Sequence, residues 1–411
     1  MFIKESKNKD ILIDTVFTVA KKAKEAKKTK GSDLVIDASL GSLYNEQNEL
    51  VTLDSVFNSY RSLSNSDYAR YSSSFSGNYN YKEAIKDFVL ENKLTKLHKE
   101  VIATPGGTGA ISITINNMLE KGQTIIIPNI GWTSYAIMAN ENNLVIDYYN
   151  MFDENENFNL KELKEKILHS LNIQNKALVI INSPLHNPTG YSLTNEEWKE
   201  LVRFINEECD NKEVIILNDV AYIDYSFNLE HSKDYLSILD NLNDNALLVI
   251  AYSCSKAFTS YGFRLGAAII AHKNNKILNQ IKNAYDKSCR TFWSNSNNGA
   301  MVNFVNVLTN YKEEYLKEKE YYINLLKERS SIIIKEAKEV NLPIYNFKEG
   351  FFITVKVSNS LKTKYHEELL KNDIYTVTVN EGIRIAICSL SIDKCYGLAR
   401  KLKDILDIIK D

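Results

Sequence analysis

The chain has 411 residues, of which 44% are hydrophobic and 25% charged, and its formal net charge is −2. These values are typical of a soluble protein with room for two domains and a core that needs no disulfide. The small net charge argues against a nucleic-acid binder held by a basic face. Five scattered cysteines indicate a reducing compartment, and no metal-binding motif is present. Without a signal peptide or a membrane-length apolar run, the expected location is the cytoplasm.

The first two thirds of the chain predict alternating strands and helices. The lysine cluster at 21–30 is typical of the solvated face of an N-terminal helix. Short runs rich in Val and Ile, apolar on both faces as in a covered sheet, follow at 101–104, 124–127, 144–149, 177–181, 214–217, 247–252 and 265–271. The clearest helix begins at Thr194, which predicts a capping box with Glu197. This alternation predicts an α/β domain with a largely parallel sheet.

The last third predicts a smaller α+β domain. Residues 298–340 read as a long helical region. Strand-like runs follow at 351–357, 375–379 and 383–388, and then a terminal helix from Ile392. We expect the N-terminal segment, up to about Asn45, to pack with this part. The large domain is therefore expected at 46–310, and the small domain at 1–45 and 311–411.

A glycine-rich turn follows the first apolar run. In open α/β sheets, ligands bind in the loops after the carboxyl ends of strands. The turn, Pro105-Gly106-Gly107-Thr108-Gly109-Ala110, opens an apolar helix, so its amides and the helix dipole predict an anion site. A plain tight turn is the alternative. The nicotinamide-dinucleotide and P-loop fingerprints are both missing, which disfavours a nicotinamide dehydrogenase.

Two ionisable residues follow later runs. Asp219, with Tyr222 three residues on, ends a buried strand and needs a cationic or donor partner, such as a protonated ring nitrogen. Lys256, in Ser253-Cys254-Ser255-Lys256, follows another such strand; desolvation would lower its pKa and suit Schiff-base chemistry. A surface lysine is the alternative. Asn187-Pro188-Thr189-Gly190 alone indicates only a type I turn.

The order and spacing of these motifs resemble the aspartate aminotransferase family, fold type I of the pyridoxal-phosphate enzymes. Besides the motifs above, the set includes Trp132, Arg264 eight residues after Lys256, Gly382-Ile383-Arg384 and the segment 40–46. The resemblance runs from about Val16 to the C-terminus. It implies a cofactor domain with a mostly parallel seven-stranded sheet, a small α+β domain formed by the two chain ends, pyridoxal 5′-phosphate, and a homodimer with shared active sites.

The resemblance assigns catalytic roles to three residues. Lys256 would carry the cofactor as a Schiff base and move a proton between substrate and cofactor. Asp219 would keep the pyridine nitrogen protonated, while Tyr222 and Asn187 would hydrogen-bond the ring oxygen. Tyr135 stands where the family often has a histidine that supports the aspartate, so the surroundings of Asp219 differ here.

The resemblance also implies how the ring and phosphate are held. Trp132 would stack on the ring, a core or interface tryptophan being the alternative. The phosphate would be bound by Gly106, Gly107, Thr108, Ser253 and Arg264, a donor set suited to a dianion. In the family a tyrosine of the neighbouring subunit also reaches this phosphate. Tyr71 is the best match, and Tyr68 is the neighbouring alternative.

Two arginines would bind the substrate. Arg384 would hold the α-carboxylate, helped by a backbone contact from Ser42 or Gly41. Arg290 resembles the arginine that crosses the dimer interface to bind the side-chain carboxylate of aspartate or glutamate. The family's Pro-Pro beyond it is replaced by Ser296-Asn297, and a surface arginine is the alternative.

The expected function is a ping-pong aminotransferase. It would move an amino group between an L-amino acid, with aspartate or aromatic donors favoured, and a 2-oxo acid such as 2-oxoglutarate. The alternative on the same scaffold is a lyase that acts by β-elimination of cysteine conjugates or by β-decarboxylation of aspartate. A cofactor-sensing regulator is disfavoured, because the residues before about 35 are too few for a DNA-binding module.

Overall fold

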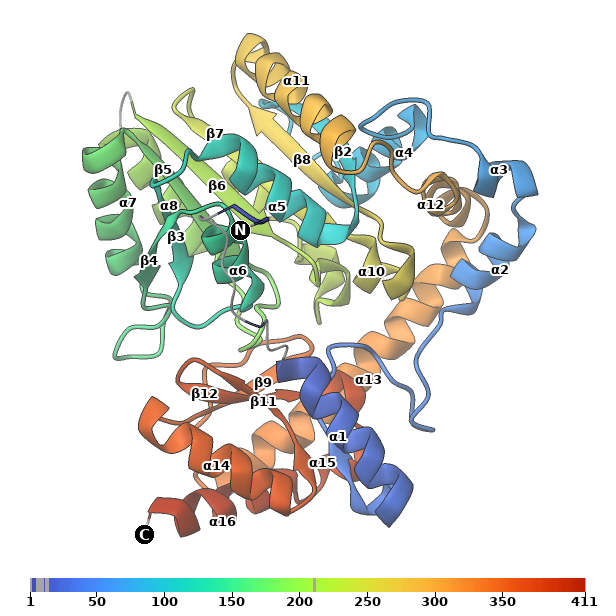
Figure 1. The fold of residues 1–411 in the computed structure, drawn as a ribbon, viewed down its shortest axis with the longest axis vertical. Helices are drawn as coiled ribbons and strands as arrows, with labels where there is room; N and C mark the ends of the chain where they lie inside the picture. The colour runs from blue at the N-terminus through green and yellow to red at the C-terminus, as the bar shows by residue number, and fades with distance from the viewer. Residues whose placement is uncertain (1, 5–10, 12–14, 210–211, 411) are drawn as a thin grey trace.

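A computed structural model describes residues 2–4, 11, 15–209 and 212–410. The larger of two bodies is built on a seven-stranded sheet (Figure 1). Its order is β2-β8-β7-β6-β5-β3-β4, and every strand is parallel to the others except β8. The strands are β2 (His98–Thr104), β3 (Thr124–Pro128), β4 (Val145–Tyr149), β5 (Lys176–Asn182), β6 (Glu213–Asp219), β7 (Ala246–Ser253) and β8 (Gly266–His272). Each of the seven predicted apolar runs corresponds to one strand, and the mostly parallel sheet is confirmed.

Both faces of the sheet are covered by helices, which explains why the central strands are apolar over most of their length. One core packs the sheet against α5 (Gly106–Met118), α6 (Ser134–Glu141) and α11 (Asn275–Phe292). The other contains residues of α7 (Leu160–Gln174) and α8 (Asn195–Glu208). Neighbouring strand residues alternate between them: Ile125 and Ile127 belong to the first core, and Ile126 to the second.

Short elements complete the large body. They are α2 (Asp54–Ser62), α3 (Asn65–Ala69), α4 (Tyr79–Ile85), the π-helical turn η2 (Lys86–Leu90), the 3-10 turns η3 (Ile223–Tyr225), η4 (Leu229–His231) and η5 (Tyr261–Phe263), α9 (Leu236–Leu239), α10 (Cys254–Ala257) and α12 (Asn298–Asn310). Helix α13 (Lys312–Glu339) then runs from the large body into the small one (Figure 1).

The small body joins the two ends of the chain. Its antiparallel sheet has the order β11-β12-β9, formed by β9 (Phe352–Lys356), β11 (Val377–Val379) and β12 (Gly382–Ala386). The parallel pair β1 (Ile36–Asp37) and β10 (Ile374–Tyr375) ties the N-terminal segment to the C-terminal part. The remaining elements are α1 (Thr15–Lys30), the 3-10 turns η1 (Ser32–Leu34) and η6 (Ile387–Ser389), α14 (Asn359–Lys371), α15 (Ile392–Cys395) and α16 (Leu398–Lys410). The boundaries at 45/46 and 310/311 stay predictions.

Two predicted helices are each divided in the structure. The region 298–340 forms α12 and α13, because Tyr311 leaves the helical conformation at φ −128°. The terminal helix breaks at Gly397, whose φ of +72° lies in the left-handed region that favours glycine. Among the described residues, no helix is both long and apolar enough to cross a membrane.

Candidate active site

A cavity of about 440 Å³ opens where β6 and β7 end. These strands are parallel neighbours with Asp219 paired to Ala251, so the residues that follow β7 lie beside the end of β6. The predicted residues that line the cavity are Gly107, Thr108, Trp132, Asn187, Asp219, Tyr222, Ser253, Lys256 and Arg264. The loops at one sheet edge thus bring together residues separated by more than a hundred positions, as the strand-end rule expects.

Lys256 is half-buried and presents its amine to this cavity. Its Nζ donates a hydrogen bond to the carbonyl oxygen of Gly41 at 2.6 Å and lies 5.4 Å from the centroid of the Tyr222 ring. The pKa of Lys256 is lowered to about 8, mainly by burial; the nearby charges of Arg384 and Arg264 contribute to the lowering, and Cys388 opposes it. An amine with this pKa is partly neutral near neutral pH, so it can act as a nucleophile or proton acceptor.

Asp219 is a buried carboxylate at the end of β6. Its Oδ2 accepts a hydrogen bond from the Tyr135 hydroxyl at 2.6 Å, and its Oδ1 accepts one from the Ala221 amide at 3.1 Å. Burial is the largest effect and raises the pKa of Asp219 to about 6, although both hydrogen bonds oppose this shift. The site therefore favours a cationic partner for this carboxylate.

The glycine-rich turn forms the anion-binding end of the cavity. Gly106, with φ +75°, begins α5, and a side chain there would come within 2.5 Å of the Arg264 guanidinium. Arg264 is held by hydrogen bonds from its Nη1 to the Ser255 hydroxyl and the Tyr261 carbonyl oxygen, both at 2.9 Å. A helix N-terminus beside a guanidinium and the hydroxyls of Thr108 and Ser253 is a suitable site for a phosphate dianion.

Arg384 lies buried beside the cavity, on β12. Its Nη2 donates to the Ser39 carbonyl oxygen at 2.8 Å, and its Nη1 donates to the Asn187 side-chain oxygen at 3.3 Å. The guanidinium stacks over the Phe352 ring, 4.5 Å from its centroid. Its Nε is buried without a hydrogen-bond partner among the described residues, and burial lowers the pKa of the group. A guanidinium with an unused donor can bind a carboxylate.

Five of the predicted residues do not line the cavity. Gly106 and Arg384, described above, are two of them, and Ser42, Arg290 and Tyr71 are the other three. Ser42 lies in the segment that covers it, next to Gly41, without lining it. Arg290, at the end of α11, is exposed; its Nη1 bonds the Ser294 hydroxyl at 2.7 Å and its guanidinium lies over Phe75. Neither contact involves a residue of the cavity, so within one chain Arg290 stands apart.

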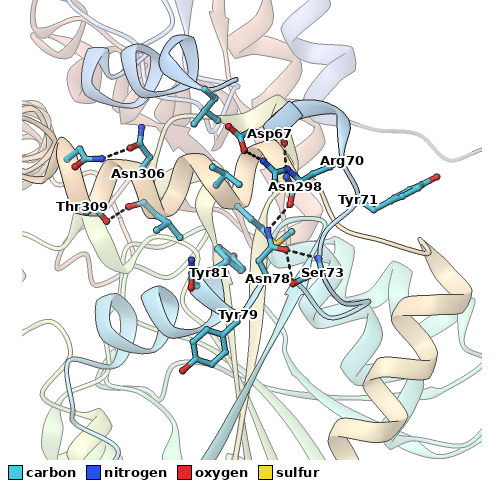
Figure 2. Close-up of a pocket in the computed structure, with 16 residues that line it drawn as sticks. Asp67, Arg70, Tyr71, Ser73, Asn78, Tyr79, Tyr81, Asn298, Asn306 and Thr309 are labelled. Carbon is cyan, nitrogen blue, oxygen red and sulfur yellow. Dashed lines mark hydrogen bonds and ion pairs between the residues drawn. The ribbon is translucent and has the colours of Figure 1, made fainter. Parts of the chain in front are cut away.

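Tyr71 is the last of them, and it lines a separate pocket of about 570 Å³ on an outer surface between α4 and α12. Its side chain projects outward (Figure 2) and is 84% exposed. Tyr68 is different, because its hydroxyl bonds the Tyr60 carbonyl oxygen and its ring contacts Gly299. Of the two tyrosines, Tyr71 is the more exposed, at 84% against 45% for Tyr68.

Besides Ile111 and Ala221, three residues of the cavity had not been named from the sequence. Tyr261 lines it and accepts a hydrogen bond from the Leu43 amide at 2.9 Å, which fixes the segment over Lys256. Asn182, at the end of β5, bonds the Asp219 carbonyl oxygen and the Asn187 amide. Because Asn182 ends a buried strand, the strand-end rule could have predicted it as a site residue. Phe17, on α1 of the small body, lines the cavity without any local motif.

Comparison with known proteins identifies the family. The model for aminotransferase class I and II matches residues 35–402. The chain belongs to this family. A solved aminotransferase from Anaerococcus prevotii superposes with a TM-score of 0.95 at 28% identity, over 98% of this chain and 99% of that one. An aspartate aminotransferase of Sulfurisphaera tokodaii is 26% identical over 345 residues, 83% of this chain and 78% of the relative. A histidinol-phosphate aminotransferase of the same organism is 26% identical over 257 residues, 60% of this chain and 66% of the relative.

This class I and II aminotransferase is a transaminase, and its family depends on pyridoxal phosphate. The cavity fits that cofactor. Asp219 has a raised pKa and no cationic partner of its own, which suits a protonated pyridine nitrogen. The turn at Gly106 and Gly107 with Arg264 suits the phosphate, and the amine of Lys256 suits the aldehyde. Groups of acidic, histidine or cysteine side chains that could hold a metal ion are absent from the described residues.

Proposed function

We propose that this transaminase binds pyridoxal 5′-phosphate through Lys256 and exchanges an amino group between an L-amino acid and a 2-oxo acid by a ping-pong mechanism. The single observation that carries the proposal is that the Lys256 amine and the buried Asp219 carboxylate line one cavity at the ends of neighbouring strands. Neither group has an ion-pair partner among the described residues, and burial moves their pKa values in opposite directions, to about 8 and about 6. A cofactor that carries an aldehyde and a protonated ring nitrogen would give each group a partner. The aldehyde would react with the amine, and the ring cation would pair with the carboxylate.

When bound, the cofactor supplies an electron-withdrawing ring that stabilises negative charge at the substrate Cα. Asp219 favours the protonated ring nitrogen, and Tyr135 keeps the carboxylate oriented through its 2.6 Å hydrogen bond. With substrate bound, the Lys256 amine would be positioned to accept the proton from the substrate Cα and to deliver it to the cofactor side of the reacting system. Its pKa of about 8 suits that task near neutral pH.

Arg384 would bind the substrate α-carboxylate. Its guanidinium is a rigid fork whose two Nη groups are fixed by Ser39 and Asn187 and whose plane stacks on the Phe352 ring. Its Nε has no hydrogen-bond partner among the described residues. A fixed fork orients the substrate, and orientation selects which bond at Cα breaks. The segment at Gly41 and Ser42 covers the Lys256 amine and would exclude water from it.

Aspartate or aromatic amino acids are the proposed donors, with 2-oxoglutarate as acceptor. The first choice draws on the similarity to an aspartate aminotransferase, and the second on the aromatic side chains of Trp132, Phe17 and Tyr261 around the cavity. An acidic side chain needs a cation, and Arg290 would supply it from a second copy of the chain. The homodimer is part of the proposal, because Arg290 and Tyr71 are exposed and stand outside their own cavity.

Reduction with borohydride tests the cofactor link. The purified protein, loaded with pyridoxal phosphate and reduced, should carry one pyridoxyl adduct, which peptide mass spectrometry should locate on Lys256. Lys256→Ala should lose the adduct, the visible absorbance and turnover, because no other described lysine lines the cavity. An adduct on another lysine, or none, would refute the proposal.

An amino-donor panel tests the reaction. Twenty amino acids are assayed with 2-oxoglutarate, and glutamate is measured as the product. Amino transfer requires glutamate in proportion to the acceptor consumed, whereas a lyase releases pyruvate, ammonia or carbon dioxide without any acceptor. Arg290→Ala should raise KM for aspartate strongly and leave KM for aromatic donors nearly unchanged. Equal KM values for aspartate in the variant and the parent would rule out the role of Arg290.

A further inference from the structure

A second lysine lies fully buried near Lys256, outside the cavity. Lys319, on α13, is 2% exposed. Its Nζ donates to the Ala257 carbonyl oxygen at 3.2 Å and lies 3.2 Å from the centroid of the Tyr225 ring. Burial is the main cause that lowers the pKa of Lys319 to about 7. Burying an amine without an ion pair is costly, and among the described residues Lys319 has none, so its position calls for a role.

The charged and titratable groups around Lys319 come from four elements. Asp224 of η3 raises the pKa of Lys319, and the Asp224 carboxylate accepts a hydrogen bond from Tyr252 of β7 at 2.8 Å. Lys233, between η4 and α9, lowers that pKa. Tyr225 of η3 and Tyr315 of α13 present their rings to the amine. The cluster holds one carboxylate and two lysines, so Lys319 can be charged or neutral near neutral pH.

The carbonyl group that Lys319 binds belongs to the residue after Lys256. Ala257 is the last residue of α10, a single turn, and a carbonyl at the end of a helix has no partner within that helix. Here the oxygen receives two donors, the Tyr315 hydroxyl at 3.0 Å and the Lys319 amine at 3.2 Å. A cation at this position is also favoured by the helix dipole. The backbone that carries Lys256 is therefore fastened to α13.

The other end of the Lys256 side chain depends on the same helix. Its amine bonds the Gly41 carbonyl oxygen, and the segment that follows Gly41 is held by Arg329, also on α13 and 0% exposed. Arg329 donates to the Tyr44 carbonyl oxygen at 3.0 Å and pairs with Glu46. Because α13 runs between the two bodies (Figure 1), one helix supports both the backbone of Lys256 and the partner of its amine.

We propose that Lys319 is a positioning residue for Lys256, acting from α13 through the Ala257 carbonyl oxygen to hold the lysine amine in its desolvated place against Gly41. The inference rests on the proposed function in that Lys256 is taken as the cofactor-binding lysine. The low pKa of Lys256 comes mainly from burial, so a loosened anchor lets water reach the amine and raises that pKa towards its ordinary value.

Competitive acetylation of the full-length protein, cleared of cofactor, tests the inference. Trace acetic anhydride is added across pH 6–11, and mass spectrometry reports the rate for each lysine, which gives the midpoint of Lys256. Lys319→Met keeps most of the length of the side chain and removes its donor. We expect it to raise the Lys256 midpoint from about 8 by roughly one pH unit. Tyr315→Phe, which removes only the other donor, should shift it in the same direction by less.

Lys233→Met is the matched control. Lys233 is also buried, donates to a backbone carbonyl oxygen, that of Phe88 at 2.7 Å, and lies over the Phe88 ring, but it does not contact α10. Its loss should leave the Lys256 midpoint unchanged, whatever it does to stability. An unchanged midpoint in folded Lys319→Met, or in Tyr315→Phe should Lys319→Met not fold, overturns the inference.

The result is independent of the proposed function. Acetylation reads the amine without any cofactor, whereas borohydride trapping reads the cofactor link. A missing adduct with a shifted midpoint would refute the proposed function alone. A correct adduct with an unshifted midpoint would refute the positioning role of Lys319 alone.

Discussion

Lys256 and Asp219 show how one buried environment prepares two opposite groups. Removal from water disfavours charge, so the pKa of the amine falls to about 8 and the pKa of the carboxyl rises to about 6. A neutral amine is the reactive form, whereas a carboxyl that keeps its proton cannot hold a ring cation. Binding of that cation would reverse the effect of burial on Asp219 and leave Lys256 reactive. The cofactor-free site is thus expected to be electrostatically unfavourable, with Asp219 as its main strained group.

Replacing Asp219 tests this expectation through stability. A carboxyl with a raised pKa binds more protons in the folded than in the unfolded chain, so its contribution is complete below about pH 4 and is lost as the pH rises through about 6. A shift of two units corresponds to roughly 3 kcal/mol. Asp219→Asn keeps the shape and the acceptor for Tyr135. The cofactor-free variant should therefore unfold at a higher urea concentration than the parent at pH 8, while binding pyridoxal phosphate more weakly.

The comparison should change with pH. At pH 5 the parent's Asp219 keeps its proton in the folded chain but ionises on unfolding, so the variant should lose about half of its advantage over the parent, and the rest as the pH falls below about 4. A variant that is less stable than the parent at pH 8 would contradict the view that the ionised carboxylate is unfavourable without cofactor. Urea unfolding followed by tryptophan fluorescence at both pH values makes this measurement.

Sequence reasoning at the scale of residues works where a local rule exists. Asp219 and Lys256 follow buried strands, so the strand-end rule predicted that they would lie close together. Lys319 has no such rule: it is one of many lysines in a polar helix, and its partner Ala257 is 62 positions away. Phe17 is likewise brought to the cavity only by the packing of α1 on the small body. Contacts of this kind depend on the tertiary fold and leave no local pattern.

The capping box of α8 is the clearest element-scale signal, and the structure confirms it. The Thr194 hydroxyl accepts a hydrogen bond from the Glu197 amide at 3.1 Å, and the Glu197 carboxylate accepts one from the Thr194 amide at 2.6 Å. The box starts the helix so that Trp198 and Leu201 enter the core on one face of the sheet. Helices without such a signal were harder to delimit, because Tyr311 and Gly397 interrupt patterns that are apolar and periodic on both sides.

Thr194→Ala should lower stability without affecting catalysis. Loss of an N-cap threonine costs about 1 kcal/mol, which in a domain of this size lowers the unfolding temperature by roughly 2 to 4 °C. No residue of α8 lines the cavity, so kcat and KM should stay those of the parent. Thr194→Ser keeps the acceptor and should stay near the parent temperature in the same calorimetric scan. An equal loss in both variants would assign the effect to the methyl group and not to the cap.

At the scale of the whole molecule, two of the predicted site residues, Tyr71 and Arg290, lie away from the cavity of their own chain. The large body with its mostly parallel sheet follows from the pattern of strands and helices, whereas the joining of both chain ends in the small body was implied by the family resemblance. The position of a second copy does not, because the exposed side chains of Tyr71 and Arg290 carry no signal of what covers them. If the cavity takes a tyrosine from a neighbour, each dimer has two sites that both depend on both chains.

Mixed dimers test that dependence. Lys256→Ala lacks the reactive amine but supplies an intact Tyr71, whereas Tyr71→Ala keeps the amine and, in its own homodimer, weakens phosphate binding. Mixed after unfolding and refolding, the two chains form dimers in which the site with Lys256 receives Tyr71 from the other chain. Activity at limiting pyridoxal phosphate should then rise above that of either parent. Random pairing of equal amounts makes half of the dimers mixed, and each mixed dimer has one complete site of two, so the activity should approach a quarter of the wild-type value.

The control uses two differently tagged chains. Mixed dimers purified by both tags should retain the recovered activity. Recovery in a Tyr68→Ala mixture but not in the Tyr71→Ala mixture would transfer the role to Tyr68, and no recovery in either would leave the site complete within one chain.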